Sequence, residues 1–145
     1  IEHNKSSGSG SWQRLHKSQS YISWSGFSFE TLCLKHIRQI KKALGIEAVF
    51  STNSSWFNES TQIDLLIDRD DNIINLCEMK YCNAPFTIDK KYYMNLKNKV
   101  AQLQQIIKTR KNIFLTMVTT FGISANEYSR ELVQNVVEAE DLFSE

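Results

Sequence analysis

The chain has 145 residues, of which 41% are hydrophobic and 11% are aromatic, and its formal net charge is +1. This length and composition are typical of one folded domain that is large enough to bury a core. No apolar run approaches the roughly 18–20 residues that span a bilayer, so a membrane-spanning chain is not expected. The nearly neutral charge leaves a nucleic-acid partner open, because the position of the basic side chains decides that question.

Residues 1–20 are rich in Gly, Ser and other polar residues and contain almost no aliphatic side chains. This composition predicts a flexible linker or arm, followed by one domain over residues 21–145. Because the chain begins with Ile and carries no signal segment, we interpret it as a fragment or processed product of a cytoplasmic protein. The odd number of cysteines (Cys33, Cys77 and Cys82) fits no metal spacing and indicates reduced thiols.

The first helix is expected to begin after Ser28 as N-cap and to end at Gly45. Its apolar stripe consists of Cys33, Ile37, Ile40 and Leu44. Residues 47–51 ("EAVFS") then predict a short strand, and the polar stretch 51–60 predicts a loop. Two apolar strands follow, over about 62–69 and 73–81.

A second helix is expected over about 88–108, and a buried strand over 112–121, which Gly122 ends. The tail from residue 131 reads either as a short helix or as an edge strand at about 133–138. The order helix, strand, strand, strand, helix, strand predicts an α/β fold with a central mixed sheet flanked by helices. We find no role for Asn126 or Tyr128.

The two central strands are expected to form a hairpin in which Asp64 lies opposite Glu78. This register gives a three-residue loop, 70–72, that ends on Asn72, a residue that tolerates the left-handed conformation such loops require. Period-two alternation then places two rows of side chains on one face of the hairpin. The rows are Gln62, Asp64, Leu66 and Asp68 on the first strand, and Ile74, Leu76, Glu78 and Lys80 on the second.

Two carboxylates on adjacent buried strands repel each other strongly unless positive charge compensates them. Lys80 supplies one such charge from the same face, and a divalent cation would supply two. Oxygen ligands without a nearby His or Cys favour Mg²⁺ or Mn²⁺. Glu30 is expected in the first turn of the first helix, where the helix N-terminus favours an acid that can reach the metal or its water shell.

These residues resemble the PD-(D/E)XK nuclease superfamily, in which an acid on a first helix precedes an Asp and a Glu-x-Lys on the following strands. The matching residues are Glu30, Asp64 and the "EMK" of Glu78–Lys80. The α-β-β-β-α-β core of that superfamily, which is the restriction-endonuclease-like core, matches the order expected here over roughly residues 24–121. Ile63 replaces the proline that precedes the Asp in the superfamily pattern.

Three longer stretches, "WSGFSFE", "QIDLLIDRDDNIINLCEMKY" and "PFTIDKKYY", resemble the C-terminal nuclease-like domain of certain prokaryotic AAA-type ATPases of archaeal and Bacteroidetes type. The resemblance implies an N-terminal ATPase module that this chain does not contain, since the chain has no phosphate-binding G-x-x-x-x-G-K-[ST] loop.

The resemblance implies metal-dependent hydrolysis of phosphodiester bonds. Asp64, Glu78 and the backbone carbonyl of Met79 would hold Mg²⁺ or Mn²⁺, which lowers the pKa of a bound water. Lys80 would orient the water and stabilise the developing negative charge. Glu30 would tune the metal shell or hold a second metal, and Gln62 would bind the phosphate or the attacking water.

A basic, aromatic stretch opens the second long helix and suggests contacts with a phosphate backbone, with one tyrosine stacked on a base. The alternative is a solvated helix face with inward-packing tyrosines. The stretch comprises Lys90, Lys91, Tyr92, Tyr93, Lys97 and Lys99.

The leading hypothesis is therefore a nuclease domain acting on DNA, with RNA also open as a substrate and a homodimer as a possible assembly. The rival hypothesis is a catalytically silent module of the same fold that binds nucleic acid or regulates an associated ATPase.

Overall fold

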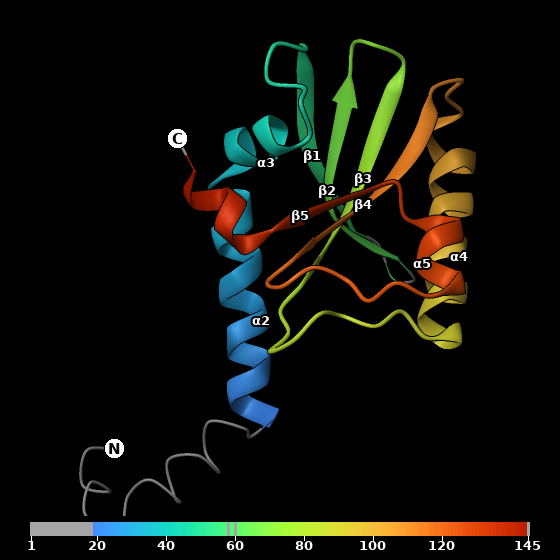
Figure 1. Cartoon of the computed structure of the whole chain (residues 1–145). Helices are drawn as coiled ribbons and strands as arrows, with labels where there is room; N and C mark the ends of the chain where they lie inside the picture. Colours follow the sequence, from blue (N-terminus) through green and yellow to red (C-terminus); the bar gives the residue numbers. More distant parts are fainter. Residues whose placement is uncertain (1–18, 58, 60, 145) are drawn as a thin grey trace, which may run out of the picture.

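The computed structural model describes residues 19–57, 59 and 61–144 (Figure 1). Most of the predicted N-terminal arm, residues 1–18, lies outside this range. The helical elements are α2 (Gln19–Leu34), α3 (Ile37–Ala43), α4 (Lys90–Ile107), α5 (Glu127–Leu132) and the 3₁₀ helix η2 (Ala139–Phe143). The strands are β1 (Ser51–Phe57), β2 (Gln62–Arg69), β3 (Ile73–Lys80), β4 (Asn112–Thr119) and β5 (Asn135–Glu138).

The strands form one mixed sheet in the order β1-β2-β3-β4-β5. The pairs β1–β2 and β2–β3 are antiparallel, whereas β3–β4 and β4–β5 are parallel. The predicted α/β class and the order α-β-β-β-α-β are confirmed. Among the described residues, no helix is long and apolar enough to cross a membrane.

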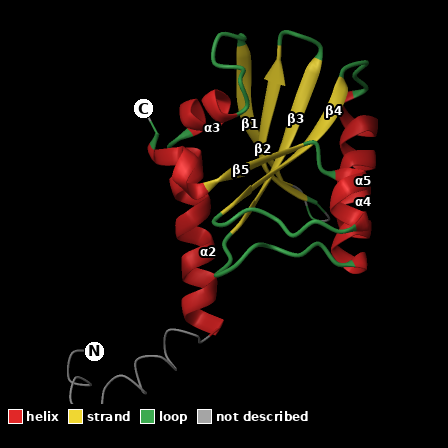
Figure 2. Cartoon of the chain, in the orientation of Figure 1, coloured by secondary structure: helices red, strands yellow, loops and turns green. Residues whose placement is uncertain are grey.

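Helices cover both faces of this sheet (Figure 2). On one face, α2, α3 and η2 pack on a cluster that includes Phe29, Leu65 and Cys77. On the other face, α4 and α5 pack on a cluster that includes Leu76 and Leu96. Each face of β3 therefore lies in its own core, which explains why this strand is apolar at nearly every position.

The β2–β3 hairpin has the predicted register. Leu66 pairs with Leu76 and Asp68 with Ile74, so the turn centres on Asp71. Asn72 adopts a φ of 73°, which is the left-handed conformation expected at the end of a three-residue loop. The regular pairing ends at Leu65 and Cys77, although both strands extend three residues further from the turn.

The prediction of one helix from Ser28 to Gly45 was wrong at its start and in its middle. The helix α2 begins at Gln19, so Ser28 lies inside it. The helix is interrupted at Lys35 and His36. There the His36 amide donates to the Cys33 carbonyl, only three residues back, and the His36 ring lies 2.8 Å from the Leu32 carbonyl oxygen. Gly45, with a φ of +74°, ends α3 as expected.

The predicted strand over 47–51 was also wrong, because this segment forms the turn that follows α3 and only Ser51 lies in a strand. The stretch expected to be a polar loop instead contains the edge strand β1. Its side chains are mostly exposed, as is usual for edge strands that must not recruit another sheet.

In the tail from residue 131, the alternative of an edge strand is confirmed by β5, which follows the last residues of α5 and precedes η2. Asn126 caps α5 by accepting a hydrogen bond from the Ser129 amide, and β5 follows beside β4. Tyr128 packs against Tyr93 with 4.9 Å between the ring centroids. Both residues that had no assigned role therefore attach α5 to the fold.

Candidate functional site

The residue Asp64 lies at an irregularity in β2. Ser54 pairs with Leu66 and Trp56 with Ile63, so Asp64 and Leu65 together lie opposite Ser55. Such a bulge interrupts the alternation of side chains. Ile63 accordingly packs in the same cluster as Leu66, whereas Leu65 packs in the cluster on the other face. The expectation that Gln62, Asp64 and Leu66 share one face was therefore wrong.

The bulge brings Asp64 close to α2. Its Oδ2 accepts a hydrogen bond of 2.9 Å from the Met79 amide, in place of a strand carbonyl. Asp64 and Glu30 line a cavity of 330 Å³, together with Gln62, whose amide lies 3.4 Å from Asp64 Oδ1. Burial raises the pKa of Glu30, and the charge of Asp64 and a hydrogen bond with it raise this pKa further. Glu30 thus lies beside Asp64 as predicted, but near the end of α2, so the argument from a helix N-terminus was wrong.

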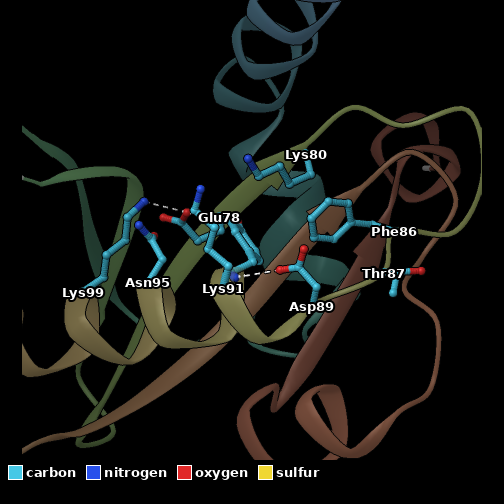
Figure 3. Close-up of a pocket in the computed structure, with 9 residues that line it drawn as sticks. Glu78, Lys80, Phe86, Thr87, Asp89, Lys91, Asn95 and Lys99 are labelled. Carbon is cyan, nitrogen blue, oxygen red and sulfur yellow. Dashed lines mark hydrogen bonds and ion pairs between the residues drawn. The ribbon is translucent and has the colours of Figure 1, made fainter.

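Glu78 points from β3 toward α4, into a second cavity of 450 Å³ (Figure 3). Glu78 is only 3% exposed, and its Oε1 accepts a hydrogen bond of 2.8 Å from Lys99 Nζ. Its Oε2 is buried and has no hydrogen-bond partner among the described residues. Burial raises the pKa of Glu78 to about 7, although the Lys99 ammonium opposes this rise.

Lys80 lines the same cavity as Glu78, as the alternation of β3 predicted. Its Nζ lies 4.9 Å from the centroid of the Tyr92 ring and 6.0 Å from that of Phe86. These two rings meet edge to face at 5.2 Å and form an aromatic wall below the ammonium group. No described residue forms an ion pair with Lys80. Cation–π attraction to the two rings therefore holds its ammonium group at the cavity.

The basic stretch of α4 divides between the cavity and the surface. Lys91 lines the cavity, whereas Lys90 does not. Tyr92 is half-buried, with its hydroxyl 3.5 Å from Glu78 Oε1. Tyr92 and Tyr93 both pack against the core cluster under α4, as the alternative of inward-packing tyrosines predicted, and the stacking of one tyrosine on a base stays a prediction.

The two acids expected in one pocket therefore line two neighbouring cavities, Asp64 with Glu30 and Glu78 with Lys80. They remain close enough for the Asp64 charge to raise the pKa of Glu78. Within the described residues, no three His, Cys, Asp or Glu side chains are grouped as metal ligands. The unpartnered Glu78 oxygen and the oxygen-only donors nevertheless fit Mg²⁺ or Mn²⁺, which commonly keep several waters and use one or two carboxylates.

Comparison with known proteins gives the family of the chain. Residues 3–99, more than half of its length, match DUF234, a family described as archaeal and bacterial proteins of unknown function. The chain belongs to the DUF234 family. No curated protein matches this DUF234 chain significantly.

A solved structure with the same fold is the crystal structure of AF1548, titled a protein of unknown function. The two chains are 15% identical and superpose with a TM-score of 0.50. The match covers 77% of this chain and 64% of AF1548, so the present chain spans less than two thirds of that protein. At this identity the likeness shows the fold.

The pairing of Lys99 with Glu78 was missed in the sequence, where Lys99 was only part of the basic stretch, and Asn95 was not singled out at all. Together with Tyr92 they follow a spacing of three and four residues on α4, which places all three on one side of the helix. That spacing was visible in the sequence, but it did not indicate that this side of α4 would face Glu78.

Proposed function

We propose that this chain is a Mg²⁺- or Mn²⁺-dependent nuclease domain that hydrolyses phosphodiester bonds of DNA. The observation that carries the proposal is the buried, unpartnered Oε2 of Glu78 in a cavity that also holds Lys80. An unsatisfied buried carboxylate oxygen is costly and calls for a cation as its natural partner. The resemblance of Glu30, Asp64 and Glu78–Lys80 to the nuclease superfamily supports the same assignment.

The residues that would hold the cation are Asp64, Glu78 and the Met79 carbonyl, with Glu30 beside Asp64. When bound, the cation supplies the activation of water and neutralises charge on the phosphate. Lys80, whose position the aromatic wall fixes, stabilises negative charge that develops on the phosphate. Lys91 binds a neighbouring phosphate at the mouth of the cavity.

The first prediction concerns Lys80. The purified protein should nick or degrade DNA with Mn²⁺ or Mg²⁺, and it should lose this activity in EDTA. Lys80→Ala should reduce cleavage by at least about a hundredfold, the range found for the loss of one electrostatic donor. Lys42→Ala, on the exposed surface of α3, provides a control with the same change of charge and should cleave normally. Cleavage by Lys80→Ala at the wild-type rate would refute the proposed mechanism.

One observation favours the second candidate function, a catalytically silent module that binds nucleic acid or regulates an associated ATPase. Lys99 already neutralises Glu78, and the described residues contain no group of three ligand side chains. Calorimetry with Mn²⁺ separates the two functions. A nuclease requires binding of Mn²⁺ at up to millimolar concentration, whereas a silent module that binds RNA or DNA needs none.

A further inference from the structure

The ion pair between Lys99 and Glu78 lies where the proposed cation must bind. Lys99 Nζ is 2.8 Å from Oε1 of Glu78, and the two side chains are 18% and 4% exposed. Figure 3 shows Lys99 reaching from α4 to the Glu78 carboxylate beside Asn95. The pair is therefore largely shielded from solvent, and its charges interact more strongly than those of a surface pair.

A divalent cation on Glu78 would lie within a few ångströms of the Lys99 ammonium group. Like charges at that separation repel strongly in a partly buried cavity. The cation and the ammonium group therefore compete for the same carboxylate. Lys99 can leave, because its flexible four-carbon side chain lines a cavity of 450 Å³ that also contains Lys80 and Lys91.

We propose that Lys99 is a displaceable counter-ion. It neutralises Glu78 while no cation is bound, and it moves onto a phosphate of the nucleic acid when a divalent cation takes its place. The inference rests on the proposed function, since the cation is the one proposed there. The inference also predicts that nucleic acid and cation bind with positive cooperativity. A phosphate that binds the Lys99 ammonium group removes it from Glu78 and so removes the repulsion that excludes the cation.

Lys99→Gln tests this inference without substrate. The glutamine amide can still donate a hydrogen bond to Glu78 but carries no charge, so the burial of Glu78 is preserved. Calorimetry should show that the variant binds Mn²⁺ at least about tenfold more tightly than the wild-type protein, because the repulsion is gone. Lys42→Gln makes the same change on exposed α3 and should leave Mn²⁺ affinity unchanged.

The outcomes separate the inference from the proposed function. Equal Mn²⁺ affinity of wild type and Lys99→Gln would overturn the inference and leave the nuclease proposal intact. Binding by Lys99→Gln alone would support the inference only if the wild-type protein binds Mn²⁺ once a DNA duplex is added; no binding by the wild type even with DNA would overturn the displacement. Absence of binding by both proteins would overturn the inference together with the proposed function.

A measurement on the wild-type protein covers the case in which Lys99→Gln does not fold. In spectra of protein labelled with ¹⁵N-lysine, the Lys99 ammonium signal should shift on addition of Mg²⁺, whereas the Lys42 signal should stay in place. A Lys99 signal that does not move while calorimetry shows Mg²⁺ binding would contradict the displacement.

Discussion

At the scale of single residues, the environment of Glu78 combines burial with an incomplete set of partners. It is a carboxylate on a central strand, almost fully buried, with one oxygen held by Lys99 and the other unpaired. Burial of a charge costs several kcal/mol unless the surroundings replace its hydration. One ammonium group replaces only part of that hydration, which is why the pKa of Glu78 rises to about 7.

This pKa leads to a prediction for stability. Because Glu78 titrates near pH 7 in the folded protein and near 4.5 in the unfolded chain, the folded protein binds more protons between these values. The contribution of Glu78 to the unfolding free energy is complete below pH 4.5 and is lost as the pH rises through 7. It amounts to roughly 3 kcal/mol, at about 1.4 kcal/mol per pH unit.

Urea denaturation between pH 4.5 and 8 measures this contribution as the difference between wild type and Glu78→Gln. The variant has no group to titrate at this position, so its stability should decline less over that range. Parallel pH profiles of the two proteins would show that Glu78 titrates normally.

Tyr92 allows the ring and the hydroxyl of the cavity wall to be tested separately. Tyr92→Phe keeps the ring below Lys80 and should retain most of the cleavage activity. Tyr92→Leu removes the ring, and kcat should fall about tenfold, since a desolvated cation–π contact is worth up to about 2 kcal/mol. Binding of DNA should change little in either variant, because neither change removes a charge. Equal losses in both would assign the effect to the hydroxyl near Glu78.

At the scale of secondary-structure elements, the β2–β3 hairpin was predictable and its bulge was not. The turn residues and the apolar alternation fixed the register, because Asn72 suits only one loop length. The bulge at Asp64 depends on pairing with β1, whose polar sequence resembles a loop. For that reason the face of the sheet on which Glu78 and Lys80 lie was predicted correctly, whereas the face on which Asp64 lies was not.

The helices illustrate the same limit. The helix α4 was predicted to within two residues, because its apolar stripe is long. The break between α2 and α3 depends on His36, whose ring contacts both the Leu32 carbonyl and Phe143 from η2. Contacts between segments so distant in the sequence leave no local pattern to read. Glu30 was predicted to lie near the metal from a helix start that proved wrong, and the superfamily resemblance matched the same residue.

The cap of α5 gives an element-scale prediction. Asn126 accepts a hydrogen bond from the Ser129 amide and donates one of 2.9 Å to the Ile88 carbonyl. Asn126→Ala removes both and should lower the free energy of unfolding by about 1–2 kcal/mol. Asn98→Ala, the same change on the exposed face of α4, is the control and should not destabilise the protein. A loss below a few tenths of a kcal/mol would mean that α5 is held by its apolar contacts alone.

At the scale of the whole molecule, the distribution of charge matters more than its sum. The chain has 17 basic and 16 acidic residues, yet three lysines face one cavity. A nucleic acid bound there would contact few phosphates, so its binding should depend weakly on salt. For duplex DNA, the slope of log affinity against log salt should be about −3 if Lys80, Lys91 and Lys99 each neutralise one phosphate.

Lys91→Ala should reduce the magnitude of this slope by about one and weaken binding of all sequences alike. Fluorescence anisotropy with a labelled duplex at several salt concentrations measures both quantities, with Lys42→Ala as the matched surface control. An unchanged slope in Lys91→Ala would place the phosphate backbone elsewhere on the molecule.

The Met79 amide, which donates to the Asp64 side chain, offers a local reporter. Most protected amides on a strand exchange with solvent when a ladder opens, but this proton is held by a carboxylate on a bulge. Its exchange rate therefore follows the position of one acid, independently of any substrate. A ligand that draws Asp64 away from Met79 would therefore speed the exchange of this amide proton, while the exchange of neighbouring amides in the sheet stays slow.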